Sequence, residues 1–489
     1  MNTKRMVKLT ALLLVFSLIL AGCSSEAITE KTTATTAVTT TATTTVVTSV
    51  TTTTESAPTT TVATDENGNV ITTTTSTTAT TTSLVSDPTK PTTPPANTSQ
   101  KIKATDMMAG IKPKTVAGKD ATEDRFVNAH TQFAVKLLQG AVKGKQGKNV
   151  LVSPLSVQLT LAMVANGAAG KTKTEMETVF GGIPMAELNQ YLYNYWTQMP
   201  NTEEYKVSIA NSLWINSGSG IKVPKSFLQT VADYYGAQVY KSNFGKQTVA
   251  DMNNWVKEYT NGMIDSIVNE LDSKADMLML LNTLFFEADW KNTYGQGQVS
   301  TGTFTTENGT QRSVRMLSQT EKMRYISDGE ATGFAKDYKD GYYSFVALLP
   351  NEGTSLDDYI ASLTAEKVRN ALNSGAISVY TEIPKFAYDC DLDMNAMLSE
   401  MGMPTAFGSG ADFSGLDTSG KGTNLGEVRH KTHIELSEEG TKAGAVTSAR
   451  VQKGLRDASV CLDRPFVYMI VDNTTYLPIF VGAVKDITG

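Results

Sequence analysis

One loop-like stretch constrains the fold more than any other: Glu438-Glu439-Gly440-Thr441-Lys442-Ala443-Gly444-Ala445-Val446-Thr447-Ser448-Ala449. Its alternate side chains are small and uncharged, namely those of Thr441, Ala443, Ala445, Thr447 and Ala449. Such a pattern suits a strand that enters a packed interior, where overpacking costs about 1–3 kcal/mol. No proline lies between Gly440 and Asp457, so every backbone N–H there can join a sheet. A flexible surface loop is the alternative.

The rest of the sequence predicts one large α+β domain. Asn128–Leu138 has the period of an amphipathic helix, Val249–Val268 is also predicted to be helical, and Met277–Phe286 suits a strand buried on both faces. Strand-like segments dominate the later chain: Tyr343–Leu349, Ile377–Ile383, His433–Leu436, Val467–Val471 and Ile479–Val484. Helices early and strands late place this domain at residues 116–489.

Composition narrows the class of partner. The chain has 489 residues, 40% of them hydrophobic and 19% charged, which fits a globular protein with a sizeable core. Its net charge of −6 lacks the excess of basic residues that is typical of nucleic-acid-binding proteins. We therefore expect no nucleic-acid partner.

The first residues have the pattern of an export signal. A positive head precedes an apolar run at 11–20 that is too short to stay as a membrane anchor. Leu20-Ala21-Gly22-Cys23 then looks like a bacterial lipobox, in which the cysteine is lipidated after cleavage. We expect a lipoprotein signal peptide at 1–22 and a lipidated N-terminus at 23–28, which fix the protein to the outer face of a bacterial membrane through Cys23. An ordinary signal peptide with an incidental cysteine is the alternative.

Residues 29–115 are predicted to form a disordered stalk. Threonine dominates the tract up to about residue 100, which includes a proline cluster at 91–95. The tract has neither helical nor strand periodicity, so it cannot form a core. An extended stalk of this kind would lift the domain off the membrane, and its hydroxyls invite O-glycosylation.

The few cysteines predict a core that is not held together by a set of disulfide bonds. Beyond Cys23 only Cys390 and Cys461 remain, far fewer than a disulfide-rich exported scaffold carries. Pairing cannot be deduced from sequence, and two separately buried thiols are the simpler interpretation.

Several separate motifs along residues 122–489 resemble the serpin family, in order and in spacing. They are Asn149-Val150-Leu151-Val152-Ser153-Pro154-Leu155-Ser156, Gly167-Ala168-Ala169-Gly170-Lys171-Thr172, Ser208-Ile209-Ala210-Asn211-Ser212-Leu213-Trp214, Leu281-Asn282-Thr283-Leu284-Phe285-Phe286 and Asp463-Arg464-Pro465-Phe466. The resemblance implies an α+β fold with helices in the N-terminal part and three β-sheets. It also implies that a central five-stranded sheet opens to accept part of a reactive loop at about 438–460.

The resemblance assigns residues to three regions. The hinge of the loop would comprise Glu438, Glu439, Gly440, Thr441, Ala443, Ala445 and Thr447. The shutter that gates the sheet would comprise Ser153, Pro154, Ser156, Asn282 and His430, with Trp290 at the breach where insertion starts. A plainer interpretation is that these polar groups only satisfy one another in the core. His430 and His433 lie three apart in strand-like sequence and face opposite sides, which argues against a metal site.

The resemblance places the reactive bond at Gly454-Leu455, whether the loop is counted forward from Glu438 or back from Phe466. Glycine is an unusual specificity residue, so Lys453-Gly454 and Arg456-Asp457 stay open, and both suit trypsin-like proteases. Cleavage after Val451 or Ala449 would suit elastase-like or subtilisin-like enzymes. Lys442, where an acid is common, and Val446 depart from the family pattern.

The resemblance implies an extracellular, suicide-type inhibitor whose partner is a serine protease. A hydrolase is disfavoured, because Gly-x-Ser-x-Gly, Ser-x-x-Lys with its partner motifs and His-Glu-x-x-His are absent from the sequence. We expect no catalytic residues, no metal, no cofactor and a monomer. The alternative is a non-inhibitory serpin that acts as a surface binding or structural module; a solute-binding lipoprotein would need a bilobed βαβ pattern.

Overall fold

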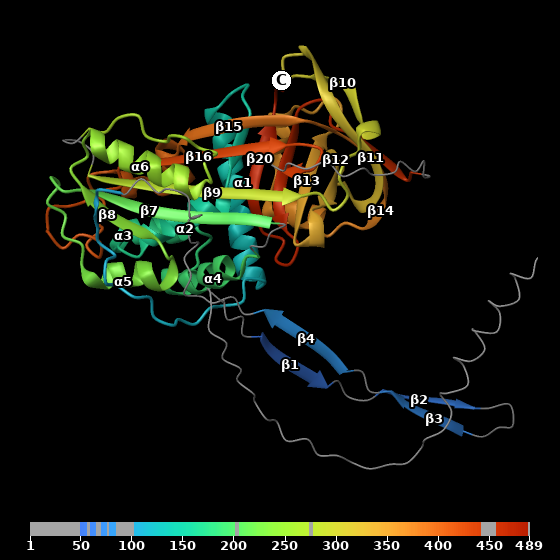
Figure 1. Ribbon diagram of the computed structural model, residues 1–489, viewed down its shortest axis with the longest axis horizontal. Coiled ribbons are helices and arrows are strands. Elements are labelled where there is room, and N and C mark those ends of the chain that lie inside the picture. The colour runs from blue at the N-terminus through green and yellow to red at the C-terminus, as the bar shows by residue number, and fades with distance from the viewer. Residues whose placement is uncertain are drawn as a thin grey trace, which may run out of the picture. The chain divides into compact units, whose positions relative to one another are not determined.

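The structure is a computed structural model (Figure 1). It describes residues 49–55, 59–64, 70–75, 78–84, 102–200, 205–272, 277–441 and 456–487. The predicted signal peptide at 1–22 and the predicted lipidation site Cys23 lie outside these ranges. Within the ranges, none of the helices has the length and apolar character needed to cross a bilayer.

Four strands lie in the threonine-rich tract, where the sequence predicts no regular structure. β1 (Ser49–Glu55) pairs antiparallel with β4 (Thr78–Leu84), and β2 (Thr59–Thr64) with β3 (Val70–Thr75). Runs of β-branched threonine and valine favour extended backbone, and this preference produces pairing without any alternation of polar and apolar residues. The role of the tract as a stalk stays a prediction.

The folded domain begins earlier than the predicted boundary at residue 116. β5 (Thr105–Asp106) pairs antiparallel with β8 (Gln238–Ser242). The backbone N–H groups of Lys103 and Ala104 donate to the buried Asp251 carboxylate at 3.1 and 2.9 Å. Residues 102–115 therefore belong to the domain, and a two-residue strand is too short to show a sequence period.

A seven-stranded sheet forms one layer of the domain. Its order is β15 (Phe386–Asp393), β16 (Glu427–Leu436), β17 (Gly440–Thr441), β9 (Leu278–Asp289), β7 (Tyr205–Asn216), β8 and β5. β7 and β9 run side by side across Figure 1. Five of the strands are long, as the resemblance implies, and the two-residue strands β17 and β5 complete the seven.

The other predicted sheets merge into one nine-stranded sheet. Its order is β18 (Ala458–Cys461), β14 (Ala376–Pro384), β11 (Gln311–Ser327), β12 (Ala331–Asp337), β13 (Tyr343–Pro350), β19 (Phe466–Asp472), β20 (Pro478–Val484) and β6 (Val150–Val152), with β10 (Val299–Thr305) beside β11. The 17-residue strand β11 pairs with β10, β14 and β12 along its length, so it joins what we expect to be two separate sheets.

Most of the helices precede β9 in the chain, as predicted. The α-helices are α1 (Asp124–Gly144), α2 (Pro154–Ala165), α3 (Gly170–Val179), α4 (Met185–Gln198), α5 (Lys225–Tyr234), α6 (Lys246–Tyr259), α7 (Leu356–Ser362), α8 (Ala365–Leu372) and α9 (Asn395–Met401). Short 3-10 turns are η1 (Gln296–Gln298), η2 (Lys339–Gly341) and η3 (Pro404–Phe407). All residues of α2 are buried, so this helix lies inside the domain.

Two apolar clusters cover the faces of the seven-stranded sheet. The larger one packs α1, α2 and the nine-stranded sheet together. In the smaller one, Trp255 of α6 and Ile267 pack against Trp214 of β7 and Leu281 of β9. α6 and the segment after it therefore shield the second face of β7 and β9.

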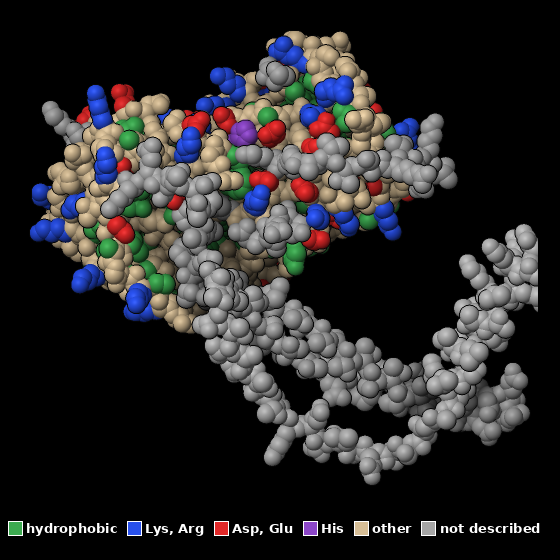
Figure 2. Space-filling model, viewed as in Figure 1, with side chains coloured by type: hydrophobic (Ala, Val, Ile, Leu, Met, Phe, Trp, Pro, Cys, Tyr) green, Lys and Arg blue, Asp and Glu red, His purple; other side chains and the backbone are tan. Residues whose placement is uncertain are grey.

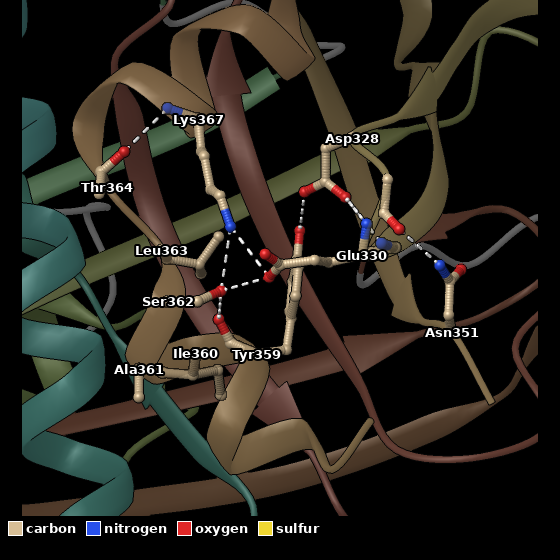
Figure 3. A network of polar contacts seen from close by, with 12 residues as sticks. Asp328, Glu330, Asn351, Tyr359, Ile360, Ala361, Ser362, Leu363, Thr364 and Lys367 are labelled. Atoms are coloured by element: carbon tan, nitrogen blue, oxygen red, sulfur yellow. Dashed lines mark hydrogen bonds and ion pairs between the residues drawn. The ribbon is translucent and has the colours of Figure 1, made fainter. Parts of the chain in front are cut away.

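A polar network fastens the β11–β12 turn to α7 and α8 (Figure 3). Asp328 accepts a hydrogen bond from the Tyr359 hydroxyl at 2.8 Å, and Glu330 accepts from the Ser362 hydroxyl at 2.7 Å. Lys367 forms an ion pair with Glu330 at 2.9 Å. This network secures the short helices on the nine-stranded sheet.

Charged side chains of both signs are mixed on the surface. On the face drawn in Figure 2, lysines and arginines are interspersed with acids. Exposed ion pairs such as Lys143 with Glu400, at 2.6 Å, link neighbouring elements. Neither sign of charge dominates this face.

Candidate functional site

The seven-stranded sheet is forked between β9 and β16. The two strands pair in parallel over Met279–Asn282 and Glu427–His430. Further along, β17 lies between them, with Thr441 opposite both Leu436 of β16 and Ala288 of β9. No direct pairing joins β9 to β16 between these two places in the described chain. The sheet is thus closed at one end and holds the start of an extra strand at the other.

Gly440 and Thr441 fit the open end through their small size. A Cβ atom on Gly440 would lie 2.1 Å from the Ala288 carbonyl oxygen, so only glycine allows this close approach of two backbones. The Thr441 side chain is 3% exposed, and its hydroxyl shares a 2.6 Å hydrogen bond with the Tyr338 hydroxyl. Thr441 is the first of the alternate small residues identified in the sequence. The structure therefore places it on the buried face, as the pattern predicts.

Trp290 supports the turn that leads into β17. Its indole N–H donates to the Ser437 carbonyl at 3.0 Å, and its backbone N–H donates to the Glu439 carbonyl at 2.7 Å. The indole is buried and stacks on Tyr338, with 4.6 Å between ring centroids. The same aromatic pair therefore contacts the turn and, through Tyr338, the side chain of Thr441.

Two lysines that the sequence analysis did not identify lie at the same end. Lys385 binds the Glu438 carboxylate at 2.6 Å. Burial raises the pKa of Glu438, but the hydrogen bond and charge of Lys385 outweigh it, and the net pKa is lowered. Lys336 is buried, pairs with Glu321 and lies 5.5 Å from the centroid of the Trp290 ring. Burial lowers the pKa of Lys336 although Glu321 opposes this shift. No sequence pattern marks these long-range partners.

The predicted shutter residues meet at the closed end of the fork. The Ser153 side chain caps α2, whose first residue is Pro154, and accepts the backbone N–H of Ser156 at 3.3 Å. The Ser156 hydroxyl donates to the Asn282 amide oxygen, and the Asn282 amide nitrogen donates to Asn211 at 2.6 Å. This buried chain of hydrogen bonds connects α2, β9 and β7. Asn211 is a member to which the sequence analysis assigns no role.

His430 lies beside this network as a neutral imidazole. The Ser153 backbone N–H donates to its Nε2 at 3.0 Å, so the proton of the neutral ring is on Nδ1. Among the described residues, Nδ1 has no hydrogen-bond partner. Burial lowers the pKa of His430 to about 4. His430 is opposite Asn282, so these two residues form the last direct pair before the fork opens.

His433 lies on the opposite face of β16 from His430, as the strand period predicts. Its Nδ1 is 2.7 Å from the Asp389 carboxylate at the surface. In the portion of the chain that the structure covers, no three His, Cys, Asp or Glu side chains are arranged to hold a metal ion. Cys390 and Cys461 are free thiols, the first buried and the second half-buried.

The far end of the reactive loop is held on the nine-stranded sheet. The Arg456 guanidinium lies over the Tyr380 ring, 5.1 Å from its centroid. Asp457 donates its backbone N–H to the Ser378 carbonyl at 2.8 Å, and its carboxylate accepts the Ser378 N–H at 3.0 Å. These contacts fix Arg456 and Asp457 along β14 just before β18. Other predicted loop residues lie outside the described ranges: Ala443, Ala445, Thr447, Lys453, Gly454 and Leu455.

Comparison with known proteins identifies the family. The profile of the family described as Serpin (serine protease inhibitor) matches residues 128–487, which is most of the chain. The chain belongs to the serpin family. The predicted α+β serpin fold is thereby confirmed, and the protein is a member of a family of protease inhibitors and not an enzyme.

Several known serpins are similar to this one over most of their length. Serpin A9 of Mus musculus is 29% identical over 383 residues, with 73% of this chain and 88% of that protein covered. Thyroxine-binding globulin of Rattus norvegicus is 28% identical over 387 residues, with 76% and 90% covered. The crystal structure of tengpin, a thermophilic serpin, in the native state is 40% identical, covers 79% of this chain and 100% of that one, and has a TM-score of 0.75.

The structure of tengpin in the latent state is also similar to this chain, with a lower score than the native state. The latent state of tengpin is again 40% identical, covers 76% of this chain and 100% of that one, and has a TM-score of 0.68. The native state is thus the better match. In this serpin β9 and β16 still pair directly at the closed end of the fork.

Proposed function

We propose that this serpin is a suicide-type inhibitor that traps a serine protease by inserting its cleaved loop between β9 and β16. The observation that carries the proposal is β17, because Thr441 already pairs with both flanking strands and Gly440 pairs with β9. The loop therefore leaves the domain from inside the gap that it would fill. Strand addition of this kind stabilises through main-chain hydrogen bonds and requires small side chains on the buried face.

The pairs at β17 predict where later loop residues would lie. Thr441 is opposite Ala288 and Leu436, and both neighbours are antiparallel to it, so each step forward in the loop is one step back on each strand. All of the flanking residues that the small side chains would meet are buried. Ala443 would meet Phe286 and Ile434, Ala445 would meet Leu284 and Thr432, and Thr447 would meet Asn282 and His430.

The same register accounts for Lys442, which departs from the family pattern. Lys442 would lie on the outer face, opposite Glu287 and Glu435. Glu435 is exposed, and Glu287 now pairs with Lys206 at 3.0 Å near the surface. A cation opposite two carboxylates is a favourable cross-strand arrangement. A lysine at this position thus suits the inserted strand of this particular chain.

The fork predicts two stages of insertion. Residues up to Val446 would fill the part where β9 and β16 do not pair. Thr447 would then have to enter between Asn282 and His430, and the remaining pairs of the parallel ladder would have to separate. The closed end, with the shutter hydrogen bonds behind it, is therefore the barrier that keeps the active form kinetically stable.

The chemistry of the trap is that of the protease. Its serine Oγ attacks the carbonyl carbon of the bait residue and forms an ester, while the peptide C–N bond breaks and the C-terminal fragment leaves with a new amino group. Water would next hydrolyse the ester. The inhibitor succeeds when insertion carries the ester-bound protease away before this step.

The contacts at the far end of the loop support a bait bond before Arg456. For Arg456-Asp457 to be the bond, a protease would have to displace Arg456 from Tyr380 and Asp457 from Ser378. Both Lys453-Gly454 and Gly454-Leu455 precede these two contacts in the chain. We therefore place the bait in the window Lys453–Leu455, with a trypsin-like target for Lys453; elastase-like and subtilisin-like targets correspond to cleavage nearer the hinge.

We also propose that the protein acts as a monomer outside the cell, held to the membrane only by a lipid on Cys23. The lipobox-like motif and the threonine-rich tract support this location. β5 attaches the chain to the outer edge of β8, so a tether entering there leaves β9 and β16 unobstructed.

The test incubates the chain from residue 23 onward with trypsin-like, elastase-like, chymotrypsin-like and subtilisin-like proteases. A complex that survives denaturing gels is expected with at least one enzyme, and the first residue of the released C-terminal peptide identifies the bond by mass spectrometry. Cleavage without any complex, or no reaction with the whole panel, would contradict the trap.

One comparison favours a second candidate, a non-inhibitory serpin that acts as a surface binding module. A relative is named thyroxine-binding globulin, so members of this family can carry a ligand. Under this alternative, loop cleavage would bring no gain in thermal stability. A rise of the unfolding midpoint after cleavage would support the inhibitor.

A further inference from the structure

Three consecutive carbonyl groups in the turn between β16 and β17 accept hydrogen bonds from residues 290–294, the segment that follows β9. The indole and the backbone N–H of Trp290 donate to the first and the third of these carbonyls. The backbone N–H of Tyr294 donates to the second, that of Glu438, at 3.0 Å. The position of residues 290–294 therefore determines where the turn lies and in which direction β17 leaves it.

One buried lysine holds the later part of this segment. Lys336 of β12 is 1% exposed. Its Nζ donates to the Asn292 carbonyl and to the Gln319 amide oxygen, both at 3.2 Å, and to the Glu321 carboxylate. An ammonium group has three N–H donors, so these three acceptors use all of them. The same Nζ lies 4.8 Å from the centroid of the Tyr294 ring, within the range of a cation–π interaction.

The partner of this lysine binds the same segment. The other carboxylate oxygen of Glu321 accepts a hydrogen bond from the Asn292 side-chain amide at 2.5 Å. The start of the segment is held in a different way, by a backbone bridge between Trp290 and Tyr338. The buried ion pair therefore acts on the part of the segment from Asn292 onward.

Stability alone does not account for a lysine at this position. Burying an ion pair costs solvation that the attraction between the charges often fails to return, and apolar side chains of similar volume are frequently as stable. A methionine would fill the space of Lys336 but would make none of its three hydrogen bonds. What the lysine adds is direction, because its three donors fix three neighbouring acceptors relative to one another.

We propose that Lys336 is a positioning residue of the inhibitory trap, which holds residues 292–294 so that the turn aims the cleaved loop into the fork between β9 and β16. The inference rests on the proposed function, because it concerns the competition between loop insertion and hydrolysis of the acyl-enzyme. A loop that starts from a fixed turn enters the fork in one orientation, which raises the rate of the intramolecular step. A turn that moves would leave more of the inhibitor cleaved without trapping the protease.

The first experiment examines the turn without any protease. Hydrogen exchange at the Tyr294 backbone N–H, measured by mass spectrometry on the chain from residue 23 onward, reports the bond to Glu438. Lys336→Met keeps a similar side-chain volume and removes the three donors. Exchange at Tyr294 is expected to become at least tenfold faster in this variant.

A second buried lysine supplies the matched control. Lys485 is 1% exposed and forms ion pairs with Glu307 at 3.2 Å and with Asp357 at 2.5 Å, and neither partner belongs to the fork. Lys485→Met therefore removes a buried cation of the same kind without touching the segment after β9. Exchange at Tyr294 should keep the wild-type rate in this control. An equal rise in both variants, or no rise in Lys336→Met, would overturn the proposal.

A double variant separates position from charge. Lys336→Met alone leaves Glu321 without its counter-ion, whereas Lys336→Met with Glu321→Gln removes both charges and keeps an oxygen for the Asn292 amide. The midpoint of thermal unfolding should return toward the wild-type value in the double variant, because no buried charge is left unpaired. Exchange at Tyr294 should stay fast. Recovery of both quantities would mean that Lys336 only balances a charge, and the proposal would be wrong.

The last experiment uses a protease that forms the complex with the wild type. In Lys336→Met and in the double variant, the rate of loop cleavage should be unchanged, while the moles of inhibitor consumed per mole of protease rise severalfold. Lys485→Met should keep the wild-type ratio. An unchanged ratio in a variant with fast exchange would refute the role of Lys336 in trapping. If the wild type itself forms no complex, the proposed function fails, and the exchange experiment alone decides whether Lys336 positions the turn.

Discussion

Replacing Ala445 by arginine tests the inserted strand directly. In the register set by β17, residue 445 would lie between Leu284 and Thr432, which are 3% and 0% exposed. A buried, unpaired cation costs about 3–5 kcal/mol. Each 1.36 kcal/mol added to the activation free energy lowers a rate tenfold. If the whole cost of burying the cation is present in the transition state, insertion would slow by roughly a hundred- to a few thousandfold. Hydrolysis of the acyl-enzyme would then precede insertion.

The assay counts moles of inhibitor consumed per mole of protease and follows the complex on denaturing gels. Ala445→Arg is expected to yield cleaved inhibitor and active protease, with almost no complex. The matched control is Lys442→Arg, which introduces the same side chain on the outer face of the inserted strand. This variant should leave the stoichiometry unchanged. The proposed register is refuted if Ala445→Arg forms complex as efficiently as this control.

Three further predictions concern the fork. Lys442→Glu would place a third carboxylate opposite Glu287 and Glu435 once the strand is inserted, so the yield of complex should fall severalfold at low salt. The yield should recover in about 0.5 M sodium chloride, because salt at that concentration screens the repulsion between exposed charges. Gly440→Ala should lower the free energy of unfolding by about 1–3 kcal/mol, measured in urea, because its Cβ would meet the Ala288 carbonyl. His430, whose pKa is about 4 when folded and about 6.5 when unfolded, stabilises the fold above pH 6.5, and this contribution of about 3 kcal/mol is lost as the pH falls toward 4. His430→Asn should flatten that part of the stability profile, although the buried His130, whose pKa is also lowered, will keep a slope of its own.

The sequence allowed the parts of the site that lie in continuous motifs to be predicted. Period two along residues 441–449 predicts which side chains face inward, and the structure shows Thr441 buried accordingly. The positions of Ser153, Ser156 and Asn282 followed from the family resemblance, and in the structure they form one connected network with Asn211. Their roles in gating stay predictions.

Features that depend on distant pairs could not be predicted. Lys385 and Glu438 are 53 positions apart, and each looks like an ordinary surface charge in sequence. The predicted helix at Val249–Val268 ends at Tyr259, because Asn261 and Gly262 have positive φ angles of 51° and 79°. The apolar pattern continues beyond this point since the segment still packs on β7 and β9. Periodicity therefore reported burial correctly but not the backbone conformation.

The enclosed helix α2 has a consequence for biosynthesis. All of its residues are buried, and β6, which precedes it, pairs with β20 near the C-terminus. A helix that is buried on every side finds all of its neighbours only when those last strands have been made. A nascent chain therefore presents this segment without partners until β20 has been made, so we expect folding to be completed only after synthesis and the unfinished chain to be prone to aggregation.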